Sequence, residues 1–298
     1  LGADPREGQG EEGDEDVLAE RQFPAREVVP FASERSAGKK VDFAGSSLEC
    51  RPLTPESIQG LDLVLASAGG KISAEWAPKF VDAGAAVVDN TSYWRMHDDV
   101  PLIVAQVNDD AVEGHNGIIA NPNCTTMQLM VALKPIHDAA RLERLVVSTY
   151  QSVSGTGREA IKELREESRA ILDGKRAEPK VFPHQVAFNV LPQVEQFLDG
   201  DDYTTEERKV MAETRKILDL DESVGISSTC VRVPVITGHS ESVNVQTKRD
   251  LSPEDCRELL SESPGLVVLD DPGAGIYPLP TAVEGRDDVL VGRIRRDP

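Results

Sequence analysis

Apolar residues in the first part of the chain come in short runs that end in turns. The segment 61–67 (LDLVLAS) predicts a buried strand, and 68–70 (AGG) predicts a tight turn before a helix opened by Ser73. The runs 84–90 (GAAVVDN) and 117–120 (GIIA) predict two more buried strands. Strand–turn–helix repeats of this kind form a doubly wound parallel sheet, whose loops at the strand carboxyl ends carry the site. We therefore expect an α/β, Rossmann-like domain first.

The pattern changes after this region. A strand is predicted over 141–155, and an amphipathic helix is predicted over 157–174. The segment 231–248 predicts two alternating strands about a turn at Thr237 and Gly238. These elements predict an antiparallel sheet carrying helices, which would form a catalytic domain.

A chain of 298 residues is long enough for about two domains. We place residues 1–122 in the first domain and residues 123–298 in the second. The stretch 1–20 is rich in Gly, Glu and Asp, so we expect it to be disordered.

The formal net charge of -20 argues against a nucleic-acid partner, because the chain as a whole offers no basic surface to displace phosphate counterions. An anionic substrate would need local basic residues set against this global field. Any functional hypothesis must therefore name those residues.

The four cysteines are scattered without the spacing of a metal site, so no bound metal is expected: Cys50, Cys124, Cys230 and Cys256. No apolar run reaches the roughly 18 residues of a membrane span, and no signal-peptide pattern opens the chain. We expect a cytoplasmic protein without a membrane partner and without disulfides.

Cys124 lies where a predicted strand ends and a predicted helix begins, in ANPNCTTMQL (120–129). A helix N-terminus exposes unpaired N–H groups and a partial positive charge, which stabilise a thiolate and an oxyanion beside it. Cys124 is therefore a candidate nucleophile. The alternative is a small buried core residue.

Three later residues are candidates for the same chemistry. Gln151 ends a strand and enters a Ser/Gly loop that could approach a ligand, although it could also be a solvated loop residue. Arg232 emerges from an apolar segment, either as an ion pair or as a bidentate carboxylate ligand. His239 follows a turn, where it could act as a general base or serve a structural role.

A capping box of Thr204 and Glu207 predicts a helix that starts at about residue 205. Glu206 and Lys209 then share one face of that helix. They form either a surface ion pair or two contacts, one anionic and one cationic, to a zwitterionic ligand.

Two loops of the first domain suit a nucleotide. In such a fold, the segment FASERSAGKK would let an arginine meet an adenosine 2′-phosphate, and its candidate residues are Ser33, Arg35 and Ser36. The second loop could lie against the nicotinamide or the pyrophosphate, and its residues are Ser67, Ala68, Gly69 and Gly70.

The order and spacing of the motifs resemble the aspartate-semialdehyde dehydrogenase family of the bacterial type. The resemblance runs from LAERQFP (18–24) nearly to the C-terminus, through FASERSAGK, SAGG, DNTSYWR, NPNCTT, YQSVSGTG, EERK and CVRVPVITGHSESV. It implies a Rossmann-like NADP-binding domain followed by an α+β catalytic and dimerisation domain with a mixed sheet. It also implies a homodimer or a tetramer, of which we expect the homodimer.

The resemblance implies NADPH-dependent reductive dephosphorylation of L-aspartyl 4-phosphate, which gives L-aspartate 4-semialdehyde and phosphate. The reaction would serve lysine, threonine, methionine and diaminopimelate biosynthesis. By resemblance, Cys124 is the nucleophile that forms a thioester, Gln151 orients the intermediate, and His239 is the acid/base.

The same resemblance assigns the substrate contacts. Arg232 matches the arginine that grips the substrate carboxylate, Glu206 meets the amine and Lys209 meets the phosphate. Arg95 matches a second phosphate contact, with Asn123 beside it. The cofactor residues implied are the two loops above together with Ser154 and Gly155.

The sequence departs from the family pattern at both ends. Where the family has a strand and a GATGxVG phosphate loop, this chain reads GADPREGQGEEGDEDV, and it stops at RRDP before a closing strand and long helix. We expect weakened NADP binding and a sheet that lacks its central strand. The chain as written would be a fragment or a degenerate copy.

Three other functions remain open. Cys, Gln and His also suit a thiol hydrolase or amidase. N-acetylglutamyl phosphate reductase is a nearer relative, although Glu206 suits a free amine better than an acylated one. The third is a non-catalytic paralogue retained for dimerisation, which the intact Cys124, Gln151, Arg232 and His239 disfavour.

Overall fold

The computed structural model describes residues 14–297, and the chain divides into two compact units. The first unit comprises residues up to 103 together with 110–122, and the second comprises 104–109 together with 123 onward. The chain passes into the second unit between Pro122 and Asn123, immediately before the helix that begins at Cys124.

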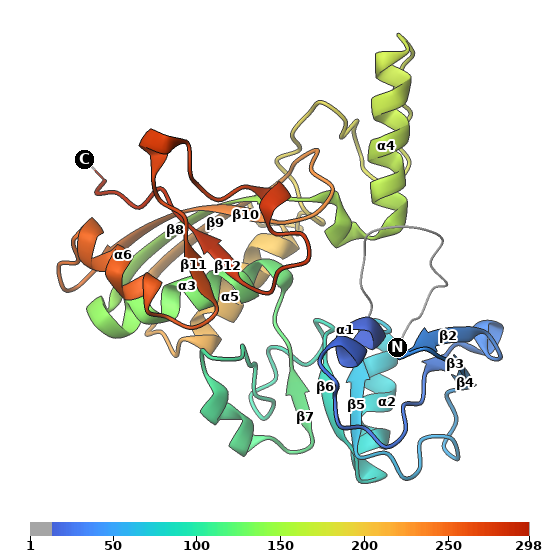
Figure 1. Ribbon diagram of the computed structural model, residues 1–298. Helices are drawn as coiled ribbons and strands as arrows, with labels where there is room; N and C mark the ends of the chain where they lie inside the picture. The colour runs from blue at the N-terminus through green and yellow to red at the C-terminus, as the bar shows by residue number, and fades with distance from the viewer. Residues whose placement is uncertain (1–13, 298) are drawn as a thin grey trace. The chain divides into compact units, whose positions relative to one another are not determined.

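The first unit contains the parallel sheet that the apolar runs predict. Strands β5 (Leu63–Ala66), β6 (Ala86–Asp89) and β7 (Ile118–Ala120) pair in parallel in that order. Helix α2 (Gly70–Asp82) follows β5 and packs on the sheet, as Figure 1 shows. The predicted α/β, Rossmann-like fold class is thus confirmed.

Two smaller pairs of strands precede this sheet. Strands β1 (Phe31–Ala32) and β4 (Arg51–Pro52) pair in parallel, and β2 (Lys40–Phe43) and β3 (Ser46–Glu49) form an antiparallel hairpin. Within residues 14–297, no strand joins β1 to the β5-β6-β7 sheet. The stretch at which the sequence lacks the expected central strand lies mostly in residues 1–13, outside the described part of the chain.

The disorder expected over 1–20 is wrong in part. Helix α1 (Asp14–Glu20) occupies the end of this stretch, and residues 1–13 lie outside the described part of the chain. Val17 and Leu18 provide apolar side chains in this otherwise acidic segment.

Ser73 does not open α2, contrary to the prediction. The helix begins at Gly70 after Gly69, whose φ of +96° lies in the region that favours glycine. Ser73 is instead buried within the helix, where its hydroxyl donates to the Asp89 carboxylate and accepts from Trp94 Nε1 at 2.9 Å. The buried Asp89 carboxylate needs hydrogen-bond donors, and the Ser73 hydroxyl satisfies it instead of capping the helix.

The second unit is built on a three-stranded mixed sheet. Its strands are β8 (Leu142–Gln151), β9 (Gly225–Arg232) and β10 (Ser240–Thr247), in the order β10-β8-β9. β10 runs antiparallel to β8, whereas β9 runs parallel to it. The mixed sheet implied by the family resemblance is confirmed, and the purely antiparallel sheet is wrong.

The two strands predicted about Thr237 and Gly238 do not pair with each other. β9 ends at Arg232 and β10 starts at Ser240, so the residues between them form an irregular connection. Both strands pair with β8, which lies far away in sequence, and local alternation carries no information about such a partner.

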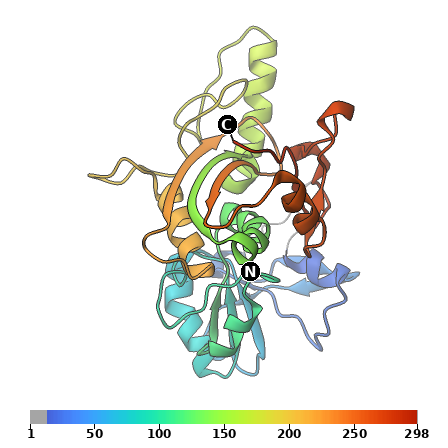
Figure 2. The ribbon, with the colours of Figure 1, turned by 90° about the vertical axis from the view of Figure 1, so that its left-hand side faces the viewer.

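Helices α3 (Cys124–Ala140) and α5 (Thr205–Ile217) pack together beside the sheet, and Figure 2 shows the strands curving around α3. Their apolar residues fill the core, among them Leu129, Met130, Leu133, Val210 and Ile217. The predicted capping box is present, with Thr204 capping α5 and the Glu207 side chain accepting from the Thr204 N–H at 2.7 Å.

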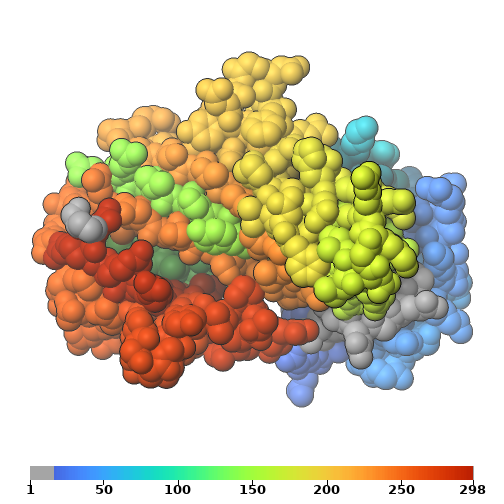
Figure 3. Space-filling model, turned by 90° about the horizontal axis from the view of Figure 1, so that it is seen from above, coloured from blue at the N-terminus to red at the C-terminus, as the bar shows by residue number. Residues whose placement is uncertain are grey.

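Helix α4 (Arg158–Leu172) anchors the long segment that follows it through two buried carboxylates. Glu163 accepts the N–H groups of Lys180, Val181 and Phe182 at 2.6–3.1 Å. Glu167 accepts those of Val186 and Ala187. Figure 3 shows α4 and this segment side by side at the surface.

The chain ends in smaller elements around α3. Helix α6 (Pro253–Ser261) and strand β12 (Val289–Val291) contact it, and strand β11 (Leu266–Val268) contacts α6 and pairs in parallel with β12. No helix described here is long and apolar enough to cross a membrane.

Candidate active site

Cys124 is the first residue of α3, directly after the turn that follows β7. Asn123 caps the helix, since its side-chain oxygen accepts the N–H groups of Thr125 at 2.8 Å and Thr126 at 3.4 Å. Pro122 precedes this cap and disfavours helical geometry at Asn121. The predicted placement of Cys124 at a helix N-terminus is thus found in the structure.

The sulfur of Cys124 faces the imidazole of His239. The distance from Sγ to Nε2 is 3.3 Å. The other ring nitrogen, Nδ1, lies 3.0 Å from the backbone N–H of Ser152 and 3.1 Å from its hydroxyl. Because a backbone N–H can only donate, Nδ1 accepts, and the proton of the neutral ring lies on Nε2, toward the sulfur.

The ring of His239 is neutral around pH 7. Burial and the positive charge of Arg232 lower its pKa to about 4. His239 can therefore donate a hydrogen bond from Nε2 and can take up a proton only when negative charge develops nearby.

The pKa of Cys124 is raised above its ordinary value. Removal of the sulfur from bulk water contributes most, followed by the negative charge of Glu206, while hydrogen bonds from Thr125 and the charge of Arg232 act in the opposite direction. Because solvent still reaches the Cys124 side chain, it partly screens the charge of Glu206, which acts more weakly on the sulfur than it would in a closed core. Neutralising Glu206 would favour the thiolate.

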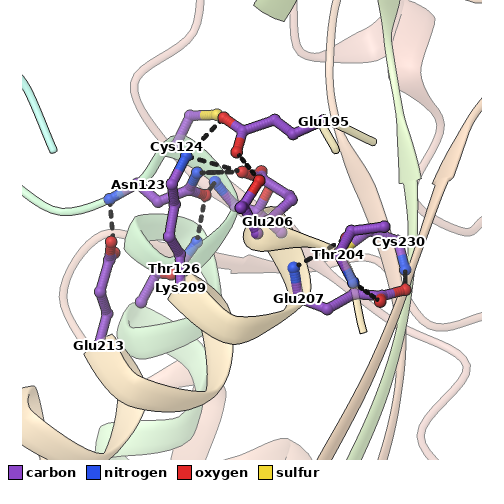
Figure 4. A network of polar contacts seen from close by, with 12 residues as sticks. Asn123, Cys124, Thr126, Glu195, Thr204, Glu206, Glu207, Lys209, Glu213 and Cys230 are labelled. Carbon is purple, nitrogen blue, oxygen red and sulfur yellow. Dashed lines mark hydrogen bonds and ion pairs between the residues drawn. The ribbon is translucent and has the colours of Figure 1, made fainter. Parts of the chain in front are cut away.

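Glu206 is the centre of a buried polar network, drawn in Figure 4. Its carboxylate accepts both contacts of Asn123 Nδ2, at 2.9 and 3.0 Å, and one from Gln151 Nε2 at 3.0 Å. Thr149 donates to the Gln151 oxygen at 3.0 Å, which fixes the orientation of the amide. Glu206 retains acceptor capacity for one more donor.

Arg232 ends β9 beside these residues and is 6% exposed. One guanidinium nitrogen donates to the carbonyl oxygen of Ser152, and the ring of Phe182 lies 5.8 Å away. The remaining guanidinium donors suit a carboxylate. Glu163 holds the backbone of Phe182, so α4 helps to place the ring that flanks Arg232.

Lys209 lies one helical turn after Glu206. Its ammonium contacts Glu195 at 2.5 Å and Glu206 at 3.6 Å. Thr205 also donates to Glu195, at 2.5 Å. Sequence reasoning missed Glu195 because it precedes α5 in an irregular segment without periodicity.

Ser152 is a second residue that sequence reasoning missed. It contacts His239 through its N–H and Arg232 through its carbonyl oxygen. Its backbone makes both of these contacts, with its hydroxyl a further 3.1 Å contact to His239 Nδ1, and backbone contacts leave no side-chain pattern in the sequence. Its hydroxyl also contacts that of Ser154 at 3.1 Å.

Arg95 is carried by the first unit, unlike the other predicted substrate residues. It is buried, and its guanidinium donates to the carbonyl oxygens of Asn121 at 2.9 Å and Asn90 at 3.0 Å. The second unit thus brings together Cys124, Gln151, Arg232, His239, Glu206, Lys209 and Asn123 without it.

The predicted cofactor residues fall into three groups. Ser33 and Arg35 are exposed around a 3-10 turn (Glu34–Ser36) that also contains Ser36. Ser67, Ala68 and Gly69 are exposed between β5 and α2, which begins at Gly70. Ser154 and Gly155 belong to the second unit.

Gly155 lies against His239 and Arg232. A methyl group added at Gly155 would come within 3.2 Å of His239 Nε2 and 3.6 Å of an Arg232 nitrogen. Among the residues described, no group of His, Cys, Asp and Glu side chains is arranged to hold a metal ion.

Comparison with known proteins accounts for both units. Residues 15–115 match the family model "Semialdehyde dehydrogenase, NAD binding domain", and 133–298 match "Semialdehyde dehydrogenase, dimerisation domain". The aspartate-semialdehyde dehydrogenase of Aquifex aeolicus is 52% identical over 94% of this chain and 83% of its own length. That of Bacillus subtilis is 46% identical over the same shares.

A solved structure agrees with these matches. The aspartate semialdehyde dehydrogenase II of Vibrio cholerae, complexed with ASA, has a TM-score of 0.88 and 42% identity, covering 95% of this chain and 84% of its own. The chain belongs to the aspartate-semialdehyde dehydrogenase family.

Proposed function

We propose that this chain catalyses the NADPH-dependent reductive dephosphorylation of L-aspartyl 4-phosphate to L-aspartate 4-semialdehyde. The reaction proceeds through a thioester on Cys124 and serves lysine, threonine, methionine and diaminopimelate biosynthesis in the cytoplasm. The observation that carries the proposal is a helix-terminal cysteine 3.3 Å from a neutral histidine, beside a buried carboxylate and a buried guanidinium.

The opposite charges of Glu206 and Arg232 suit an α-amino acid. Arg232 would hold the substrate carboxylate with its free donors, and Glu206 would accept from the ammonium. A buried carboxylate favours a free amine over an acylated one, which separates this substrate from N-acetylglutamyl phosphate.

Acylation begins when the substrate ammonium neutralises the charge of Glu206, because that charge raises the pKa of Cys124. The thiolate attacks the acyl carbon, a C–S bond forms, and the C–O bond to phosphate breaks. N–H groups at the start of α3 can stabilise the tetrahedral oxyanion. Lys209 neutralises the departing phosphate, and the family resemblance assigns Arg95 to the same anion.

The loops of the first unit fit a nicotinamide nucleotide. The Gly69–Gly70 turn exposes the N-terminus of α2 at the carboxyl end of a parallel strand, which suits an anion. Exposed Ser33 and Arg35 suit a 2′-phosphate, with Ser36 beside them, and Ser67, Ala68, Ser154 and Gly155 complete the proposed set. When bound, the cofactor supplies a hydride to the thioester carbon.

His239 then handles the proton of the hemithioacetal. Its Nε2 lies within hydrogen-bond reach of Sγ, so it can also reach an oxygen on the carbon that is bonded to that sulfur. In the reverse direction, Nε2 would accept the hydroxyl proton in the other neutral tautomer, in which Nδ1–H donates to the Ser152 hydroxyl. Gln151, which Thr149 and Glu206 hold, would orient the acyl group.

The test separates acylation from reduction. Incubation with aspartyl phosphate, with nucleotide withheld, should add an aspartyl group to Cys124 that mass spectrometry detects, and Cys124→Ala should show none. Semialdehyde, phosphate and NADP together should then produce NADPH, with NAD less effective. Thioester hydrolysis without any nucleotide requirement would instead indicate a hydrolase.

We also propose a homodimer, because residues 133–298 match a dimerisation domain. Light scattering of the purified chain should give twice the mass of one chain. A monomer at all accessible concentrations would contradict this assignment.

A further inference from the structure

Gln128 lies one helical turn after Cys124 on α3 and contacts the segment that carries His239. Its Nε2 donates to the Glu241 carboxyl at 2.7 Å and lies 3.4 Å from the carbonyl oxygen of His239. The helix that presents the sulfur therefore also grips the backbone of the residue that faces the sulfur.

Glu241 is half-buried on β10, opposite Thr149 of β8. Burial raises its pKa to about 8, and the hydrogen bond from Gln128 acts in the opposite direction. Glu241 is thus mostly protonated at neutral pH, and its carbonyl oxygen accepts from Gln128 without placing a charge beside the sulfur.

The segment that carries His239 needs such support. It is irregular from Val233 onward, and Gly238, immediately before His239, has a φ of +89°. The N–H groups of Val153 and Ser154 donate to the carbonyls of Val235 and Ile236, and the pairing of β10 with β8 fixes the chain again from Ser240. Between these two points, Gln128 contacts the His239 carbonyl and Ser152 contacts the ring.

We propose that Gln128 and Glu241 form a clamp that positions His239 against Cys124. Glu241 fixes the amide of Gln128, and that amide restrains the His239 carbonyl, so that Nε2 stays 3.3 Å from Sγ. Both are positioning residues, because neither reaches the reacting atoms. The clamp deepens the proposed function, and turnover measurements of it rest on that function.

The primary readout does not need turnover. The rate of alkylation of Cys124 by iodoacetamide, followed by mass spectrometry across pH, reports the thiolate that the His239 N–H stabilises. Gln128→Asn, which shortens the amide, and Glu241→Leu should each lower the rate near pH 7 by about tenfold and move the profile to higher pH.

Two further variants make the test specific. Glu241→Gln keeps an oxygen that accepts the same hydrogen bond, so it should stay within about twofold of the wild type. Lys134→Ala removes an exposed ion pair with Asp138 from the same helix and should leave the rate unchanged. Circular dichroism confirms that each variant is folded, and Gln128→Asn decides the question should Glu241→Leu not fold.

Turnover adds a second readout. Gln128→Asn should lower kcat by about tenfold and leave KM for aspartyl phosphate unchanged, because the contacts of Arg232 and Glu206 are intact. An unchanged alkylation profile in Gln128→Asn, or a Glu241→Gln variant as impaired as Glu241→Leu, would overturn the clamp. A wild-type chain that is alkylated normally but fails to turn over would refute the proposed function, while the alkylation series still decides the clamp.

Discussion

At the scale of single residues, the sulfur of Cys124 is subject to opposing influences. Hydrogen bonds from Thr125 at the start of α3 and the charge of Arg232 favour its anion, while burial and the charge of Glu206 favour the thiol. A resting thiol protects the group from indiscriminate alkylation and oxidation. Substrate binding at Glu206 would remove this protection only when the correct amine is present.

Glu206→Gln should therefore lower the pKa of Cys124, because it removes a negative charge that raises that pKa. The pH profile of iodoacetamide alkylation should move to lower pH, while kcat/KM for aspartyl phosphate should fall by at least about thirtyfold as the ammonium loses its partner. Glu222→Gln, at a carboxylate that is 92% exposed, is the matched control. A profile that does not move would show that Glu206 does not govern the sulfur.

Gly155→Ala should disturb His239 rather than substrate binding. The added methyl would lie 3.2 Å from the ring, which must move by a few tenths of an ångström, but at an ordinary 3.6 Å from Arg232. We expect kcat to fall by about tenfold with little change in the KM for aspartyl phosphate. Gly114→Ala, where a methyl meets nothing within 4 Å, should behave as the wild type. A raised KM at constant kcat would contradict this placement.

Arg232→Lys should impair carboxylate recognition. An ammonium can keep the charge, but it cannot both contact the Ser152 carbonyl and present a fork to the substrate. We expect kcat/KM to fall by about a hundredfold or more. Steady-state kinetics with aspartyl phosphate measures this. An unaltered kcat/KM would show that Arg232 does not bind the substrate carboxylate.

At the scale of elements, α3 and α5 set the geometry of the site, and the sequence predicts both well. Their starts are encoded locally, by Asn123 before Cys124 and by Thr204 with Glu207. The order of β8, β9 and β10 was not predictable, because those strands pair across long sequence separations. Ser73 misled for a related reason, since its partner Asp89 lies in another element.

Thr204→Ala should weaken the start of α5, which carries Glu206 and Lys209. Loss of the side-chain acceptor for the Glu207 N–H should lower the free energy of unfolding by about 1 kcal/mol. Denaturant unfolding measures this, and Thr204→Ser should restore most of the loss. A Thr204→Ser variant as unstable as Thr204→Ala would show that packing of the methyl group matters, rather than the cap.

At the scale of the whole molecule, the roles of residues follow from contacts that no single segment contains. The cluster around Cys124 unites parts of the chain more than a hundred residues apart, such as Cys124 with His239. Sequence motifs could nominate its side chains, but not the backbone contacts of Ser152 or the pair of Gln128 and Glu241. These contacts depend on the register of β8 against β10, which cannot be read from either strand by itself.

The stability of the whole chain should depend on pH through Glu241. Its pKa is raised from 4.5 to about 8 by burial, so between these values the folded state retains a proton that the unfolded state has released. This contribution to stability therefore falls as pH rises through that interval. Glu241→Gln removes the effect, and its Tm relative to wild type should be higher at about pH 8 than at about pH 5, by about 3 °C. A Tm difference that does not vary with pH would contradict the burial of this acid.

Asn123 is held from both directions by one helix. Glu206 takes its side-chain amide and Glu213, two turns along α5, takes its backbone N–H at 2.7 Å. The start of α3, which carries Cys124, is consequently tied to α5, which carries Glu206. A mutation that shifts α5 should therefore also shift the Cys124 sulfur. Substrate preference should accordingly be easier to alter through the segments around Arg232 than by displacing α3 or α5.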